Sequence, residues 1–204
     1  MLLLVSLAIA AALSFGSASD TALEVRVTDA DGAPLANAVV TLPAPEGFEP
    51  ERHRFSWPMM MEQQRIQFTP HVLVVPRGVQ VEFPNRDRVR HHVYSFSGRN
   101  AFELQLYGRE ETRLVGFGHP GAVVLGCNIH DQMIGYIRVV ETPYAMKTGA
   151  DGSAVIADAP AGDLTVTVWH PYATSSDGTV TVSLNADARA SGPLTVSVPI
   201  RAPR

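Results

Sequence analysis

Apolar and polar residues alternate over short stretches of this chain, and glycine, proline or Asp-Gly pairs separate one stretch from the next. Residues 23–27 alternate apolar with charged side chains, residues 29–34 supply turn formers, and residues 38–42 predict a return strand. Only residues 102–107 suggest a short helical turn. Four further strands are predicted near the C-terminus, at residues 154–156, 164–169, 179–184 and 194–200. The pattern therefore predicts an all-β chain built as sandwiches.

The middle of the chain predicts a second group of strands. Three of them fall at residues 72–75, 79–83 and 93–96. Two more, at residues 121–125 and 134–140, are apolar and β-branched, which is typical of buried strands. The segment from Cys127 to Met133 connects this last pair, so we expect it to form one short loop between adjacent strands.

That loop carries three side chains that bind soft metals. Cys127 is the only cysteine of the chain, and His130 and Met133 follow it at intervals of three residues. A thiolate, an imidazole and a weak thioether favour copper held for one-electron transfer, provided that a second histidine arrives from elsewhere. The loop before residues 93–96 offers His91 and His92 for that role.

Composition excludes few functions. The 204 residues carry 16 Lys+Arg and 20 Asp+Glu, a formal net charge of -4, so neither nucleic-acid binding nor a strongly acidic protein is implied. After the first apolar run, no stretch is apolar enough to span a membrane. The sequence does not indicate an oligomeric state.

The N-terminus predicts export. Residues 1–19 combine a short apolar run with small residues near Ala18, which is typical of a secretory signal peptide, although no basic residue precedes the run. The mature protein is expected in the periplasm. Exported proteins usually pair their cysteines in disulfides, so a single thiol calls for an explanation such as metal binding.

The residues of the middle segment, including Phe68-Thr69-Pro70, resemble the cupredoxins, which are small blue-copper electron carriers. The Cys-x-x-His-x-x-Met loop is most similar to the amicyanin type, and the whole segment resembles plastocyanin-like proteins described under methylamine utilisation. The resemblance implies a Greek-key sandwich with one type 1 copper ion, held by His91, Cys127, His130 and Met133. It also implies a non-enzymatic carrier that exchanges electrons with a protein partner through a partly exposed His130, within a patch that includes Ile129 and Ile134.

His92 is the alternative to His91. In amicyanin-like sequences the first histidine ligand lies six residues after the asparagine that ends the preceding strand, which here is Asn85 and selects His91. Alternation along a strand also sends the two histidines to opposite faces. In that family an asparagine usually follows the ligand and helps to tie the two ligand loops together, so His92 at this place puts the surrounding hydrogen bonds, and hence the redox potential, in question.

The flanking segments resemble a different module. Residues 25–40 look like the first hairpin of carboxypeptidase-regulatory-like, transthyretin-type domains, and residues 148–169 look like the second half of the same module. We therefore expect a cupredoxin domain at residues 45–142 to be inserted into a smaller β-sandwich formed by residues 20–44 and 143–204.

Other functions remain open at this stage. The thiol of Cys127 would suit a Cys-His hydrolase, although no nucleophile signature surrounds it. Two histidines and one cysteine would suit zinc, although zinc rarely recruits a thioether such as that of Met133. Copper storage, or a sandwich that binds carbohydrate or protein without redox chemistry, is the alternative from another class.

The remaining candidates have ordinary structural interpretations beside their functional ones. Arg86, Arg88, Arg90 and Arg99 surround the first histidine and would steer an acidic redox partner, or they belong to a solvated turn. Adjacent methionines in a strand point to opposite faces, so the run at residues 59–61 favours core filling over a cuprous site. His71, His119 and the segment 169–171, which contains His170, lack partners at ligand spacing. We interpret His71 and His119 as structural or surface residues, and residues 169–171 as a strand end and a turn.

Overall fold

The computed structural model describes residues 22–201, so the predicted signal peptide at residues 1–19 lies outside the described residues. Strands dominate the described part, and its single α-helix, α1, is five residues long. The strands and the helix, in chain order, are β1 (Leu23–Thr28), β2 (Val39–Thr41), β3 (Glu62–Gln63), β4 (Phe68–Thr69), β5 (Val72–Pro76), β6 (Val79–Pro84), β7 (His91–Ser95), β8 (Phe102–Tyr107), β9 (Thr112–Phe117), β10 (Gly121–Cys127), β11 (Ile134–Val140), β12 (Ala145–Lys147), β13 (Ser153–Ile156), β14 (Leu164–Trp169), β15 (Thr179–Leu184), α1 (Ala186–Ala190) and β16 (Leu194–Ser197).

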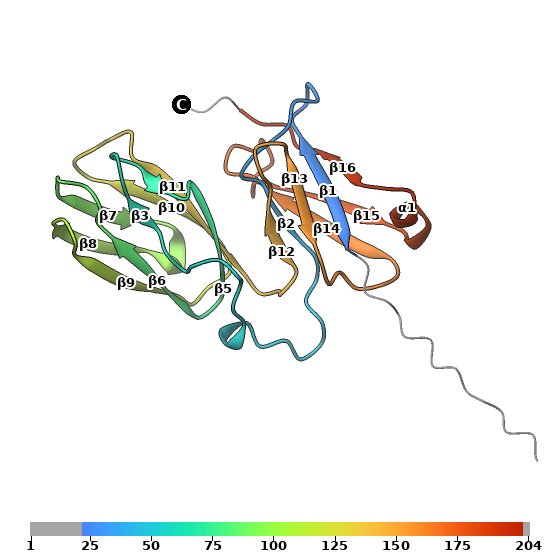
Figure 1. The fold of residues 1–204 in the computed structure, drawn as a ribbon, viewed down its shortest axis with the longest axis horizontal. Helices are drawn as coiled ribbons and strands as arrows, with labels where there is room; N and C mark the ends of the chain where they lie inside the picture. The colour runs from blue at the N-terminus through green and yellow to red at the C-terminus, as the bar shows by residue number, and fades with distance from the viewer. Residues whose placement is uncertain (1–21, 202–204) are drawn as a thin grey trace, which may run out of the picture.

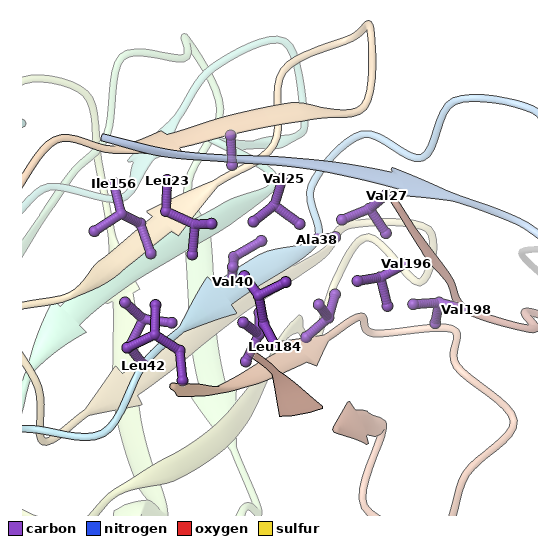
Figure 2. Packing of buried hydrophobic residues seen from close by; sticks show 14 of the residues in the cluster. Leu23, Val25, Val27, Ala38, Val40, Leu42, Ile156, Leu184, Val196 and Val198 are labelled. Carbon is purple, nitrogen blue, oxygen red and sulfur yellow. The ribbon is translucent and has the colours of Figure 1, made fainter. Parts of the chain in front are cut away.

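The two ends of the chain together form one sandwich, which we call the flanking unit. A three-stranded sheet in the order β13-β1-β16 faces a four-stranded sheet in the order β12-β2-β14-β15. Alternate residues of β1 are buried, and Figure 2 shows Leu23, Val25 and Val27 pointing toward Val40 and Leu184 of the opposite sheet. The alternation of β1 in the sequence therefore places every second side chain in the core between the two sheets.

The middle of the chain forms a second sandwich, which we call the central unit. Its main sheet has the strand order β5-β11-β10-β7-β8, and the β6-β9 pair and the short β3-β4 pair complete it. Its core contains Phe83, Phe117, Leu125 and Ile137 together with Cys127 and Met133. The parallel β5-β11 and antiparallel β11-β10-β7 pairings bring the ends of three strands to the same edge of the sheet.

The central unit is inserted in the flanking unit. In sequence, β3 to β11 fall between β2 and β12, and these two strands pair directly with one another in the flanking unit. Figure 1 shows the central unit, green to yellow, beside the blue, orange and red strands of the flanking unit. The predicted fold class, an all-β cupredoxin-like sandwich inserted in a second sandwich, is confirmed.

Aromatic and β-branched side chains join the two units. Val72 of β5 and Tyr136 of β11 share a buried cluster with Val39 of β2 and Trp169 of β14. The Arg138 guanidinium lies over the Trp169 ring, 5.4 Å from its centroid. The flanking unit therefore covers the outer face of β5 and β11, which explains why every residue of β5 is buried, whereas Val124 on β10 of the same sheet stays exposed.

Some local predictions were wrong. Residues 102–107 form strand β8 rather than a helical turn, because they pair with β7 along its length. Strand β9 and helix α1 were not predicted; α1 begins where the Asn185 side chain accepts a hydrogen bond from the Ala188 N–H at 2.7 Å, a common N-cap. Residues 38–42 were predicted as the return strand of a hairpin with residues 23–27. The strand there, β2, lies instead in the sheet opposite β1, so the segment between them connects the two sheets.

Candidate metal centre

The loop from Cys127 to Met133 is a tight connection between two paired strands. Cys127 is the last residue of β10, and β11 begins directly after Met133. Within the loop, the His130 N–H donates to the Cys127 carbonyl at 3.4 Å and the Met133 N–H donates to the His130 carbonyl at 2.9 Å. Two successive turns therefore hold Cys127, His130 and Met133 at fixed positions relative to the sheet.

The second element is the start of β7, which pairs with β10 beside Cys127. His91 is fully buried. The pairing of β7 with β8 has an irregularity, a shift of register between His91 and Val93. At that irregularity the His92 side chain turns away, and its Nε2 lies 2.8 Å from a carboxylate oxygen of Glu103. The structure thus places His91, and not His92, beside Cys127.

Three donor atoms meet at this edge of the sheet. The Cys127 sulfur lies 3.7 Å from Nδ1 of His91 and 3.5 Å from Nδ1 of His130. All three atoms lie within 4.8 Å of one another. One thiol and two imidazole nitrogens therefore point at a common centre, which is the arrangement needed to bind one ion.

Met133 belongs to the same neighbourhood. Its side chain is 1% exposed and packs in the core cluster that also contains Cys127. Both residues line a surface hollow of about 460 Å³ together with Tyr94, Phe96 and Ile134. Met133 therefore lies beside the same hollow as Cys127, with its thioether at the end of the core that holds the thiol.

The electrostatics favour the thiolate. Burial by itself would raise the pKa of the Cys127 thiol, but hydrogen bonds from the His91 ring, from the backbone at His92 and Ile129 and from the His130 ring lower it to about 6. Burial likewise opposes protonation of His91, and its hydrogen bonds to Cys127 and to Asp87 raise its pKa. The thiolate, which is the form that binds metals, is therefore accessible near neutral pH.

Asp87 is a residue that the sequence analysis missed as part of this site. Its Oδ2 lies 2.9 Å from Nε2 of His91, on the opposite side of the ring from Cys127. The same carboxylate accepts hydrogen bonds from the backbone N–H groups of Arg65 at 2.6 Å and Ile66 at 2.9 Å. When Nε2–H donates to Asp87, the lone pair of Nδ1 is free to bind a metal. Its position four residues before His91 was the available signal.

The two ligand loops are tied to each other through the backbone. The Asn128 N–H donates to the His92 carbonyl at 3.1 Å. Asn85, which is fully buried, donates from its side chain to the carbonyls of Val89 and Tyr107 and accepts from the Asp87 N–H. His92 stands where the resemblance implies an asparagine that ties the loops together, and the backbone bond from Asn128 to His92 provides a link in its place.

The chemistry of the donor set decides which metal these residues suit. A buried thiolate with two neutral imidazole nitrogens and a neighbouring thioether is a soft set that suits copper in both of its common oxidation states. Structural zinc sites usually have four nitrogen or sulfur donors from histidine and cysteine, and thioethers are rare among them. The residues present therefore fit copper.

The surface around the centre is partly apolar. His130 is half-buried, while Ile129 and Ile134 are 49% and 42% exposed, and Phe96 is exposed to 86%. Arg86 pairs with Glu62 and Glu110, whereas Arg88, Arg90 and Arg99 are exposed and form no ion pair within residues 22–201. Exposed Ile129 and Ile134 therefore lie on or beside the loop of His130, and exposed Arg88 and Arg90 lie on the loop of His91. Arg99 does not surround His91 as expected, because it follows the other end of β7, in a turn that Asn100 bonds to His119.

The other sequence candidates lie elsewhere. Met61 is fully buried in the central core, and Met60 lines a cleft against the flanking unit, so adjacent methionines of this run do not converge. His71 and His170 contact the ring of Tyr172 between the units. His119 lies in a turn that the Asn100 side chain holds through two hydrogen bonds. None of these histidines belongs to the cluster around Cys127.

No protein-family model and no curated protein matches the chain. Among solved structures, it is similar to a copper-containing nitrite reductase from Thermus scotoductus SA-01, with 30% identity and a TM-score of 0.39 over 48% of this chain and 25% of the reductase chain. The chain therefore spans about a quarter of the reductase. A reduced amicyanin variant matches with 20% identity and a TM-score of 0.38 over 50% of this chain and 98% of amicyanin. A purple cupredoxin from Nitrosopumilus maritimus matches with 19% identity and a TM-score of 0.36 over 40% and 96%.

The central unit is a cupredoxin-like β-sandwich with a His-Cys-His cluster at one end. The sheet order and the position of the cluster between β7, β10 and β11 define this class from the structure itself. No helix among the described residues is long and apolar enough to cross a membrane.

Proposed function

We propose that this protein carries single electrons by means of one type 1 copper ion bound by His91, Cys127, His130 and Met133. The observation that supports it most directly is the convergence of one thiol and two Nδ1 atoms within 4.8 Å. Copper held by such donors supplies a one-electron couple between its cuprous and cupric states. The proposal describes a carrier and not an enzyme.

Each residue has a role in this proposal. Cys127 supplies the thiolate, and Asp87 orients the His91 ring so that Nδ1 faces the sulfur. Strand pairing and the two turns of the loop hold the donors in place, so little rearrangement accompanies a change of charge. Met133 would supply a weak thioether donor, and the half-buried His130 would provide the route for electrons to the surface.

The location and the partner are parts of the same proposal. We infer that the chain is exported to the periplasm, since residues 1–19 have the pattern of a signal peptide. We also infer that its redox partner is a protein with an acidic surface, because the exposed Arg88 and Arg90 lie on the loop that carries His91.

We propose domain boundaries at residues 44/45 and 142/143, and a transthyretin-type origin for the flanking unit. The division of buried side chains supports the boundaries, because one core cluster contains residues 23–42 and 154–198 and the other contains residues 61–139. A role in methylamine utilisation stays a prediction from resemblance.

The test is copper titration of the purified protein. We expect Cu(II) to produce intense blue absorption that ascorbate bleaches reversibly. Cys127→Ser should abolish the colour, and Met133→Leu should keep it while shifting the reduction potential. Tight binding of colourless Cu(I) without reversible oxidation would instead support copper storage, the second candidate, which rests on the same donors. Binding of zinc in preference to copper would contradict both.

A further inference from the structure

A cleft of about 520 Å³ lies between the two units, and none of the four proposed copper ligands lines it. One wall is β5 of the central unit and another is the end of β12 of the flanking unit. Its surface is mostly apolar and includes Trp57, Leu73 and Met146. Volume, apolar lining and a position between two domains are all typical of small-molecule sites.

Lys147 brings a positive charge to this apolar cleft. It is the only lysine of the chain, in which every other permanently basic side chain is arginine. It is half-buried, and its Nζ donates one hydrogen bond to the Val72 carbonyl at 2.9 Å. No carboxylate pairs with it among the described residues, and burial lowers its pKa. An ammonium group has three N–H donors, so two remain for a ligand.

The other charged group in the lining does not neutralise Lys147. Glu62 pairs with Arg86, with its carboxylate oxygen 3.3 Å from the guanidinium. His71 lies within range of this charge, because burial and then the charge of Lys147 lower the pKa of its ring. The end of the cleft at Lys147 is therefore positive, because the one carboxylate in the lining, that of Glu62, pairs with Arg86 instead.

The apolar part of the cleft is held in place before any ligand arrives. The Trp57 indole N–H donates to the Val74 carbonyl at 2.8 Å, and its ring stacks on Phe55 at 4.4 Å between centroids. Val72 and Leu73 belong to a strand that is buried along its whole length. A preformed wall of this kind reduces the entropy lost when a ligand binds.

We propose that this cleft binds a small organic anion, with an apolar and preferably aromatic body against Trp57 and Leu73 and a carboxylate or sulfonate at Lys147. A charge-assisted hydrogen bond in such surroundings is stronger than one in water, and it satisfies donors that the protein leaves open. The site is separate from the proposed copper centre, and its test does not require copper.

The test compares two fluorescent probes of similar shape and different charge. Anilinonaphthalene sulfonate carries one sulfonate, and phenylnaphthylamine is uncharged. We expect the folded protein to bind the sulfonate more tightly. Lys147→Met keeps the length of the side chain and should weaken sulfonate binding about tenfold or more, while binding of the uncharged probe stays unchanged. The uncharged probe therefore also reports that the variant cleft is intact.

Two further variants and a label locate the site. Lys147→Arg should retain most of the sulfonate affinity, and Arg26→Met, which removes an exposed charge on β1, should leave it unchanged. Reductive methylation labels only Lys147 and the α-amine, so the methyl signal of Lys147 in NMR should move with the sulfonate and not with the uncharged probe. The proposal would be overturned if wild type bound both probes with equal affinity or bound neither of them. It would also be overturned if Lys147→Met left the affinity for the sulfonate probe unchanged.

Discussion

At the scale of single residues, Asp87 is the side chain on which the orientation of His91 depends most. Its carboxylate contacts Nε2 of the His91 ring, and it accepts hydrogen bonds from the backbone N–H groups of Arg65 and Ile66. Both of these residues have positive φ, 57° and 58°, which non-glycine residues rarely adopt. The carboxylate compensates for this conformation by accepting both N–H groups, so one acidic side chain stabilises a loop and orients a proposed ligand.

We predict that Asp87→Asn lowers the free energy of unfolding of the metal-free protein by about 1–3 kcal/mol, because an amide offers one acceptor oxygen to three donors. In the copper form the reduction potential should rise, on the order of 60 mV for each 1.4 kcal/mol of stabilisation that the cupric state loses with the negative charge. Denaturant titration and voltammetry measure the two effects.

Asp131→Asn is the matched control, because Asp131 is an exposed carboxylate in the other ligand loop. It should change stability little and shift the potential less than Asp87→Asn does. If the two variants behave alike, Asp87 has no particular influence on His91.

The sequence predicted the short-range part of this site and missed the long-range part. Cys127, His130 and Met133 are close in sequence, so their spacing alone indicated a common loop. Strand alternation and the position of Asn85 distinguished His91 from His92. The bonds from residues 65 and 66 to Asp87 depend on a turn more than twenty residues away, and no local pattern predicts where such a turn will lie.

At the scale of elements, the hairpin of β10 and β11 depends on close contact with β4. Gly135 follows the ligand loop, and a Cβ at this position would lie 2.7 Å from the Cβ of Phe68. Phe68 is buried in the central core and cannot move without opening it. Glycine at position 135 thus allows the start of β11 to lie directly on β4.

We predict that Gly135→Ala lowers the free energy of unfolding by about 1–3 kcal/mol, because overpacking forces strand and side chain apart. Gly116→Ala in β9 is the control, because nothing lies within 4 Å of the added Cβ. The control should leave stability unchanged or raise it by about 0.5 kcal/mol. Chemical denaturation of both variants decides the matter, and equal losses would show that the contact with Phe68 is unimportant.

Strand positions were easier to predict than strand partners. Residues 72–75 and 79–83 were predicted as strands and became β5 and β6, yet these two strands lie in different sheets although only Arg77 and Gly78 separate them. The continuous apolar run of β5 and the alternation of β6 indicate which side chains are buried, but they do not indicate which strand lies beside either of them. Partner choice depends on the whole set of strands, so short-range patterns do not contain it.

At the scale of the whole molecule, the contact between the units depends on aromatic and histidine side chains. Tyr136 of the central unit lies against Trp169 and Tyr172 of the flanking unit. The sequence predicted the insertion from its flanking motifs, but residues 169–171 on the flanking side of this contact were interpreted only as a strand end and a turn. Their role appears only when β11 and β14 are placed side by side.

His170, whose ring packs against Tyr172 of this contact, gives the stability of the protein a dependence on pH. Its Nε2 lies 3.2 Å from the Ala36 carbonyl, and its Nδ1 accepts from the Tyr172 N–H at 3.2 Å, an arrangement that only the neutral ring satisfies. Burial lowers its pKa below the ordinary 6.5. The stability that neutral His170 contributes is therefore complete above pH 6.5, and it is lost as the pH falls through the folded pKa.

We predict that unfolding free energies of wild type and His170→Gln converge as the pH is lowered. At about pH 7.5 the variant should be less stable by about 1–3 kcal/mol, because the ring hydrogen bonds are lost. Below pH 6.5 the wild type alone takes up a proton at position 170 on unfolding, so the gap should narrow by at most about 1.4 kcal/mol per pH unit. Denaturant titrations of the metal-free proteins at several pH values measure this difference in the free energy of unfolding. The other histidines are present in both proteins, so their contributions cancel in the difference. Parallel curves would mean that His170 does not titrate differently in the folded and unfolded chains.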